Sequence, residues 1–231
     1  MAGERNLADW QPCALPGETV LEGYGVRLEP FDLTRHPAAL FPVLGGQDNA
    51  ALWDWILHGP FDTTHALGVF FAARVASGEW KPMVIYREGE DAPAGTWSYM
   101  RLRPDQGSAE IGFVLHGFSL QKSRAGTAAF YLGAKHLFED LGYRRYEWKC
   151  NAQNEASRRA AERYGFTYEG RFRNDAVWRG RNRDTDWYSI IDSEWPLVKV
   201  ALEAWLDPGN FDAAGNQRAG LATLRERLAK G

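Results

Sequence analysis

The pattern of apolar and polar positions predicts helices in the first third of the chain and strands after it. The clearest early segment is 60–80, where a threonine cap is followed by apolar residues three and four positions apart and Gly78 ends the pattern. Weaker signals predict short helices at 32–44 and 48–57. A strand or hairpin at 19–32 precedes them, with two glycines at its centre.

From Lys81 onward the apolar residues alternate with polar ones, which is typical of strands. Alternating segments predict strands at 81–88, 95–103, 108–116, 144–150, 166–173 and 185–192. Helical patterns predict helices at 121–141, 154–166 and 193–206, and Gly142 and Gly165 end the first two. The strand, helix and strand at 108–150 form a unit that must be locally parallel. This order of elements predicts an α/β (α+β) fold with a mixed sheet.

The same pattern suggests how the chain is divided. Residues 1–17 have little periodicity, so we expect an N-terminal arm there. We expect residues 18–206 to form one domain. Residues 207–231 predict a C-terminal tail of loop and one short helix. No internal repeat and no linker divides the chain further.

Composition narrows the class of protein. The chain has 231 residues, 45% of them hydrophobic and 25% charged, which is ordinary for a soluble globular protein. The formal net charge of −3 argues against a general attraction to nucleic acid or to a membrane surface. Two distant cysteines give no disulfide framework, and neither a signal peptide nor a membrane span is expected, so we expect a cytoplasmic protein. The histidines are scattered and no metal site is predicted.

One short stretch carries candidate chemistry. The turn "LQKSRAGT" at 120–127 joins a predicted buried strand to the long helix, and it combines small residues with Lys122 and Arg124. A helix start has unpaired backbone N–H groups and positive dipole character, so it favours phosphate, and small residues allow close approach. The alternative is an ordinary helix start with a serine cap and a small packing face. No P-loop motif competes with it.

These residues carry a family resemblance. The stretch "EIGFVLHGFSLQKSRAGTAAF" resembles motif A of the GNAT superfamily of acyl-CoA N-acyltransferases, in which Gln121 and Gly126 match the signature. Arg124 stands where the signature has its middle glycine. "NAQNEASRRAAERYGFTYEG" resembles motif B, and its N-E-A-S and G-F-x-x-E-G pieces are similar to the RimJ/RimL-like branch. The resemblance spans roughly 21–192.

The resemblance implies a fold and a co-substrate. The fold would be a mixed, mostly antiparallel sheet of about seven strands flanked by helices, with a splayed central strand pair at 110–116 and 146–150. The pantetheine arm of acetyl-CoA would bond the backbone of Val114, Leu115 and His116. The pyrophosphate would lie on the N–H groups of Gln121, Lys122, Ser123, Arg124, Ala125, Gly126 and Thr127.

The resemblance also implies an activity, which is acetyl-CoA-dependent N-acetylation of a primary amine by direct attack. Glu110 is the candidate base, and its alternatives are substrate binding and a structural ion pair. Ser157 is the candidate acid, and its alternative is a helix cap. Asn154 either caps the same helix or contacts the pantetheine, with capping preferred. Ala161 stands where many relatives have a tyrosine.

The acceptor and the assembly stay open. A protein N-terminus or a small amine fits the resemblance, and a non-catalytic acyl-CoA-binding or RNA- or ribosome-associated protein on the same fold is the alternative function. Nucleic acid is not the expected partner at this net charge, and a homodimer stays open. The basic stretch from Arg171 to Arg183 is either a surface for an acidic substrate or RNA, or a solvated hairpin face balanced by aspartates.

Overall fold

The computed structural model describes residues 6–230 and gives a mixed α/β fold. Eight strands occur in the described residues: β1 (Leu21–Gly23), β2 (Val26–Pro30), β3 (Trp80–Arg87), β4 (Pro93–Arg103), β5 (Ser108–His116), β6 (Arg145–Asn151), β7 (Thr167–Trp178) and β8 (Arg181–Ile191). The α-helices are α1 (His36–Leu44), α2 (Thr64–Ala76), α3 (Arg124–Lys135), α4 (Glu155–Tyr164), α5 (Trp195–Leu206) and α6 (Leu221–Leu228). The expected mixed class is confirmed, and the expected number of about seven strands becomes eight because residues 19–32 form a hairpin of two strands, β1 and β2.

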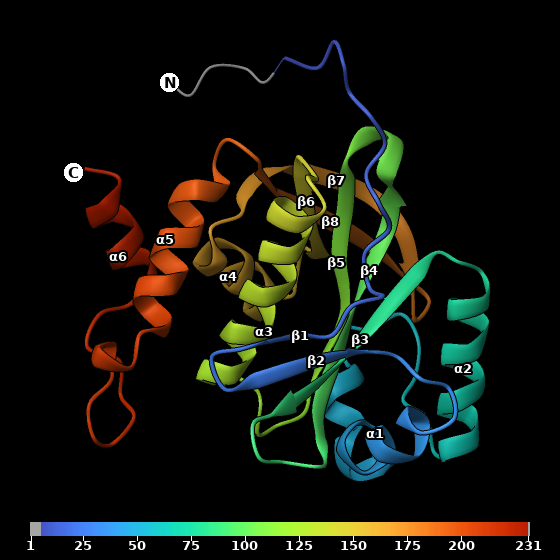
Figure 1. Ribbon diagram of the computed structural model, residues 1–231. Helices are drawn as coiled ribbons and strands as arrows, with labels where there is room; N and C mark the ends of the chain where they lie inside the picture. Colours follow the sequence, from blue (N-terminus) through green and yellow to red (C-terminus); the bar gives the residue numbers. More distant parts are fainter. Residues whose placement is uncertain (1–5, 231) are drawn as a thin grey trace. The chain divides into compact units, whose positions relative to one another are not determined.

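The chain divides into two compact units. The N-terminal unit comprises Leu15–Arg103 and Ala109–His136, and its strands follow the order β1-β2-β3-β4-β5, with β4 and β5 side by side (Figure 1). The C-terminal unit comprises the described residues up to Ala14, Pro104–Ser108 and the chain from Leu137 onward. Its strands follow the order β6-β8-β7. Strand pairing is antiparallel for β1–β2, β2–β3, β3–β4, β6–β8 and β7–β8.

In the N-terminal unit, β4 has a helix packed against each face. Trp97 and Tyr99 face α3, where the Tyr99 hydroxyl donates to the carbonyl oxygen of Gly133 at 2.9 Å. A Cβ at Gly133 would lie 2.7 Å from the Trp97 ring, so a glycine is needed for this close packing. The opposite face of the unit packs on α1 and α2 through a buried apolar cluster of Leu40, Leu44, Trp53, Leu67, Phe71, Val84, Tyr86 and Leu115.

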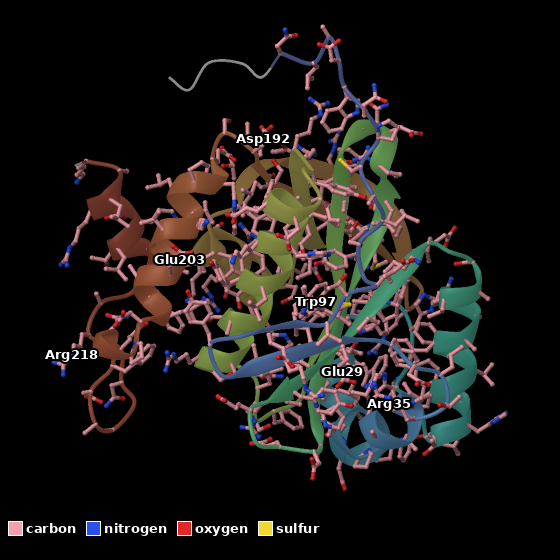
Figure 2. The ribbon with its side chains drawn as sticks, in the orientation of Figure 1. Glu29, Arg35, Trp97, Asp192, Glu203 and Arg218 are labelled. Carbon is pink, nitrogen blue, oxygen red and sulfur yellow. The ribbon has the colours of Figure 1, made fainter. Side chains whose placement is uncertain are left out.

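A charged cluster fixes the start of α1. Glu29, at the end of β2, is buried and pairs with Arg27 and Arg35, and Figure 2 shows Glu29 and Arg35 close together. His36 is fully buried, and its Nδ1 accepts from the backbone N–H of Asp32 at 2.7 Å. Burial, aided by Arg35, lowers the pKa of His36. A neutral His36 is therefore expected to act as an acceptor that stabilises this turn.

The C-terminal unit contains a longer hairpin than the sequence predicts. β7 and β8 continue through the basic stretch and meet at Arg179 and Gly180, both with positive φ (48° and 74°), as a two-residue type I′ turn requires. The expected strands at 166–173 and 185–192 are therefore too short. The extension of β8 at 181–184 is polar, and the apolar residues of the β7 extension are three in a row at 176–178, so no alternation marks either segment as a strand.

Other boundaries also differ. The helix expected at 121–141 begins at Arg124, because Ser123 is its cap, and a wider π turn at His136–Asp140 follows its regular part. The short helix expected at 48–57 is a 3-10 helix that ends at Trp53. The expected tail at 207–231 contains α6, and residues 1–5 of the expected arm and Gly231 lie outside the described residues.

Candidate active site

A bulge in β5 decides which side chains share a face. Phe113 has φ 50°, a left-handed conformation that is rare for an aromatic residue and typical of a bulge in a strand. Its ring lies 4.8 Å from the Trp80 ring and 5.3 Å from the Phe70 ring, on the α2 side of the sheet. Leu115, two residues on, belongs to the cluster on α1 and α2. His116 instead contacts α3.

The bulge places Glu110 on the same face as Phe113. A Cβ at Gly112 would lie 2.6 Å from the Met100 Sδ and 2.7 Å from the Glu110 Oε1, so Glu110 and Met100 flank this glycine. Met100 pairs across the sheet with Trp80, which contacts Phe113. Glu110 is therefore on the α1 and α2 face, and Gly112 provides the space for its carboxylate.

Glu110 is a buried acid with a cationic neighbour. Its exposed fraction is 2%, and the Arg101 Nε lies 3.6 Å from its Oε2. Burying an ionised carboxylate is costly unless a counter-charge or hydrogen bonds compensate, so the arginine favours the charged form. The α1 and α2 face of β5 therefore contains a buried carboxylate with a counter-charge beside it.

The turn after β5 is held by its own hydrogen bonds. The Leu120 N–H donates to the Gly117 carbonyl oxygen at 2.8 Å, and the Ser123 hydroxyl donates to the Leu120 carbonyl oxygen at 2.7 Å. The Gly126 N–H donates to the Ser123 Oγ at 3.0 Å, so the serine cap of the alternative interpretation is present. A Cβ at Gly126 would lie 2.9 Å from the Leu120 oxygen, so this position requires a glycine.

The start of α3 has donors for an anion. Hydrogen bonds within the turn and first helical turn use the N–H groups of Gln121, Ser123, Gly126 and Thr127. Arg124 and Ala125 occupy the first two helical positions, whose N–H groups have no acceptor within a helix. Lys122, exposed and with φ 54°, and Arg124 add positive charge. Within the seven residues expected to hold the pyrophosphate, four N–H groups thus make internal hydrogen bonds, and the phosphate site stays a prediction.

His116 packs against this helix start. Its Cε1 and Nδ1 lie 3.4 Å from the position of a Cβ on Gly126, and its carbonyl oxygen accepts from the Gln121 amide at 3.3 Å. Burial lowers the pKa of His116 to about 4, and the positive end of α3 acts in the same direction. We therefore expect a neutral imidazole at pH 7.

The C-terminal unit holds the remaining two predicted residues. The Asn154 Oδ1 accepts from the Ser157 N–H at 3.1 Å, which makes Asn154 the N-cap of α4, as preferred. The Ser157 Oγ accepts from the Trp148 Nε1 at 3.0 Å, and its hydroxyl donates toward the neighbouring Cys150. Burial raises the pKa of the neighbouring Cys150 to about 11, which keeps it a thiol, although a hydrogen bond from Ser157 opposes the shift.

Part of the basic stretch is structural. The Arg171 Nε and Nη2 donate to the two carboxylate oxygens of Asp186 at 2.7 and 3.0 Å, and the Arg158 Nε lies 3.3 Å from the same carboxylate. Asp186 is fully buried. Arg171 therefore has a counter-charge within the hairpin, which agrees with the interpretation of a balanced hairpin face.

The predicted site residues fall into two groups. Glu110, Val114, Leu115, His116 and Gln121–Thr127 lie on β5, its turn and α3, whereas Asn154 and Ser157 lie at the start of α4. The predicted splay involves strands of both units and stays a prediction, as do the ligand contacts. Sequence reasoning missed Arg101 and the bulge at Phe113, because neither a positive φ nor a cross-strand ion pair leaves a local pattern.

Among the described residues, no group of three or more His, Cys, Asp or Glu side chains has an arrangement that could hold a metal ion. Within residues 6–230, no helix combines the length and apolar character that crossing a membrane requires.

Several known proteins share this architecture. Residues 26–167 match the family model described as an acetyltransferase (GNAT) domain. A GCN5-related N-acetyltransferase from Brucella melitensis is 38% identical, with a TM-score of 0.90 over 94% of this chain and 99% of that one. A probable acetyltransferase (GNAT family) from Chromobacterium violaceum ATCC 12472 is 35% identical, with a TM-score of 0.79 over 85% and 98%.

A more distant structure shares the fold alone. RimL, a ribosomal alpha-N-protein acetyltransferase solved in complex with coenzyme A, is 22% identical, with a TM-score of 0.65 over 76% of this chain and 99% of that one. No protein with a curated description matches the chain.

Proposed function

Because this chain belongs to the GNAT family of N-acetyltransferases, whose members use acetyl-CoA, we propose that it transfers the acetyl group of acetyl-CoA to a primary amine by direct attack. One observation supports the proposal. Within the N-terminal unit, the basic start of α3 follows the bulged strand β5, and β5 places the buried carboxylate of Glu110 on the face of the sheet away from α3.

The start of α3 fits the phosphate end of acetyl-CoA. The N–H groups of Arg124 and Ala125 and the cationic side chains of Lys122 and Arg124 would hold the pyrophosphate. Gly126 and Ala125 keep the first turn small, which allows the phosphates to approach the backbone. Backbone groups of Val114, Leu115 and His116 would hold the pantetheine arm. Asn154, whose Oδ1 caps α4, would add only a minor contact to the binding of this arm.

The chemistry needs a base for the acceptor. A protonated amine has no lone pair, so it must lose a proton before its nitrogen attacks the thioester carbonyl carbon. Glu110, buried and paired with Arg101, would take that proton through a water molecule. The N–C bond forms, the nitrogen releases its remaining extra proton to solvent, the C–S bond breaks, and the products are an N-acetylated amine and coenzyme A.

The departing thiolate needs a proton. Ser157 would donate it, because its Oγ already accepts from the Trp148 indole and its hydroxyl proton, which is directed toward the Cys150 sulfur, can turn to another acceptor. In this scheme the serine regains a proton from solvent. A backbone N–H near Leu115 would stabilise the oxyanion that forms during attack.

The acceptor that we propose is a protein N-terminus or a small amine. RimL is described as an alpha-N-protein acetyltransferase, and it shares the fold of this chain. A protein N-terminus and a small molecule both present a primary amine, so a panel of peptides, polyamines, amino sugars and free amino acids spans the class.

The test is thiol release from acetyl-CoA with that amine panel, in the wild type and in Glu110→Gln. The variant keeps size and polarity but cannot accept a proton, so its rate should fall roughly 10²–10⁴-fold with little change in CoA affinity. Glu147→Gln is the matched control, because Glu147 is equally buried (2% exposed) and lies 2.7 Å from an arginine, Arg145. Its rate should stay near the wild-type value.

The outcomes separate the alternatives. CoA binding without acetylation of any amine would support a non-catalytic acyl-CoA-binding protein. Acetylation at an unchanged rate in Glu110→Gln would retain the transferase and remove Glu110 as its base. A raised amine KM with an unaltered pH profile would assign Glu110 to acceptor binding.

A further inference from the structure

We propose that Arg101 is a positioning residue for the transfer reaction, whose guanidinium holds Glu110 ionised as the base. The proposal rests on the proposed function, because it assigns a task to a residue of the same site. Arg101 lies on β4, the strand beside β5, and it does not have to contact either substrate to act.

The geometry of the pair is asymmetric. The side chain of Glu110 is 3% exposed, whereas that of Arg101 is 47% exposed. The arginine can therefore keep part of its guanidinium hydrated while its Nε lies 3.6 Å from the buried carboxylate. A carboxylate in this position gains a counter-charge, and the cation loses only part of its solvation.

The backbone at Arg101 is strained in a way that suggests a requirement for its side chain. Arg101 has φ 46°, in the left-handed region that glycine adopts freely and that other residues, apart from asparagine and aspartate, rarely adopt. Its neighbour Met100 is the last β4 residue paired with β3, so the left-handed residue comes directly after that pairing ends. A glycine would adopt this conformation without strain, yet the position holds the residue whose cation lies beside Glu110.

The surroundings of the carboxylate explain why the cation matters. The described contacts of the carboxylate include the Arg101 cation and the uncharged Met100 on β4, with Gly112 beside it on β5. Loss of this cation would shift the balance toward the neutral acid. A protonated Glu110 cannot take a proton from the acceptor amine, so removing Arg101 should disable the base.

Three substitutions at one position test this, with thiol release measured on the best amine of the panel. Arg101→Ala removes the guanidinium, Arg101→Gly removes it and also relieves the backbone, and Arg101→Lys keeps a positive charge. At pH 6 the rate should fall about tenfold or more in the alanine and glycine variants. The acidic limb of their pH–rate profiles should lie at higher pH than in the wild type, so their rates should recover as pH rises. Arg101→Lys should restore much of the rate. Arg103→Ala, which removes an exposed arginine two residues along β4, should match the wild type.

A second measurement needs no turnover. Carbon-13 NMR of protein labelled at the glutamate carboxyls follows the Glu110 resonance, which is identified by its absence in Glu110→Gln. The titration midpoint should move to higher pH in Arg101→Ala and Arg101→Gly, and stay in place in Arg103→Ala. The sign follows because loss of a cation destabilises the anionic form.

The two measurements keep the outcomes distinct. If the glycine variant keeps both the wild-type pH profile and the wild-type carboxyl titration, the proposal is overturned, even if its melting temperature falls. If no amine is acetylated by the wild type, the proposed function fails. The NMR titration then still decides whether Arg101 holds Glu110 ionised, and an unmoved midpoint would overturn that assignment as well.

Discussion

At the scale of single residues, His116 shows how packing sets a charge state. The imidazole contacts the first turn of α3, and burial lowers its pKa from 6.5 to about 4. In the unfolded chain the same group would titrate near its ordinary value of about 6.5. His116 is therefore protonated at a lower pH in the folded protein than in the unfolded chain.

This difference predicts a loss of stability on acidification. Between about pH 6.5 and 4 the unfolded state gains a proton that the folded state does not, so the free energy of unfolding decreases across that window and levels off below it. The size should be roughly 1–3 kcal/mol, discounted for the partial exposure of the ring. Denaturant unfolding at several pH values should show a shallower dependence in His116→Asn. Equal slopes in the two proteins would contradict a depressed pKa for His116.

At the scale of elements, the start of α3 combines helix stability and anion binding, and one substitution separates them. An aspartate at Ala125 places a negative charge in the first turn, where the helix dipole favours it. The same charge would repel a pyrophosphate. Ala125→Asp should therefore keep or slightly raise thermal stability, by up to about 1 kcal/mol, while weakening CoA binding tenfold or more.

Calorimetric titration with CoA and thermal denaturation measure the two effects. Ala125→Asn is the control for size, and it should bind CoA more tightly than the aspartate variant. Unchanged CoA affinity in a folded Ala125→Asp protein would exclude a phosphate at this helix start. Gly126 is a poorer test position, because any Cβ there would meet the Leu120 carbonyl oxygen at 2.9 Å and disturb the turn itself.

At the scale of the whole molecule, the chain beyond the matched family region supports the helix that carries Ser157. The Arg225 guanidinium, on α6, donates to the carbonyl oxygens of Arg163 and Glu162 at 3.0 Å each. These carbonyls are in the last turn of α4, where a cation is favoured, and the Glu162 oxygen also accepts from the Gly165 N–H at 3.2 Å. Gly165, which ends α4, leaves no room for a Cβ beside Val198.

Arg225→Ala should therefore destabilise the protein. Loss of two charge-assisted hydrogen bonds to carbonyl groups should lower the free energy of unfolding by about 1–3 kcal/mol. Arg227→Ala, at an exposed position of the same helix, is the control and should change stability by less than about 0.5 kcal/mol. Chemical denaturation of both variants gives the comparison. Similar changes in the free energy of unfolding for the two variants would mean that the Arg225 hydrogen bonds to α4 contribute nothing beyond general surface charge.

Much of the fold was predictable because its signals are local. Thr63 caps α2 and Asn154 caps α4 through their own side chains, and Gly165 ends α4 with a left-handed backbone. Such signals need no knowledge of distant residues. The extended β7–β8 hairpin was missed because its tip has no apolar alternation, and its pairing depends on cross-strand hydrogen bonds.

Local sequence was enough to predict the order of strands and helices, the small and basic character of the turn at 120–127, and an acid on the strand before it. How these pieces act depends on contacts that form only when distant strands pack together. The bulge at Phe113 turned Glu110 and Leu115 to one face, and β4 brought Arg101 to the carboxylate. The physical reason is range: caps, turns and amphipathic faces follow from neighbouring residues, whereas bulges and buried ion pairs depend on which strands pack together.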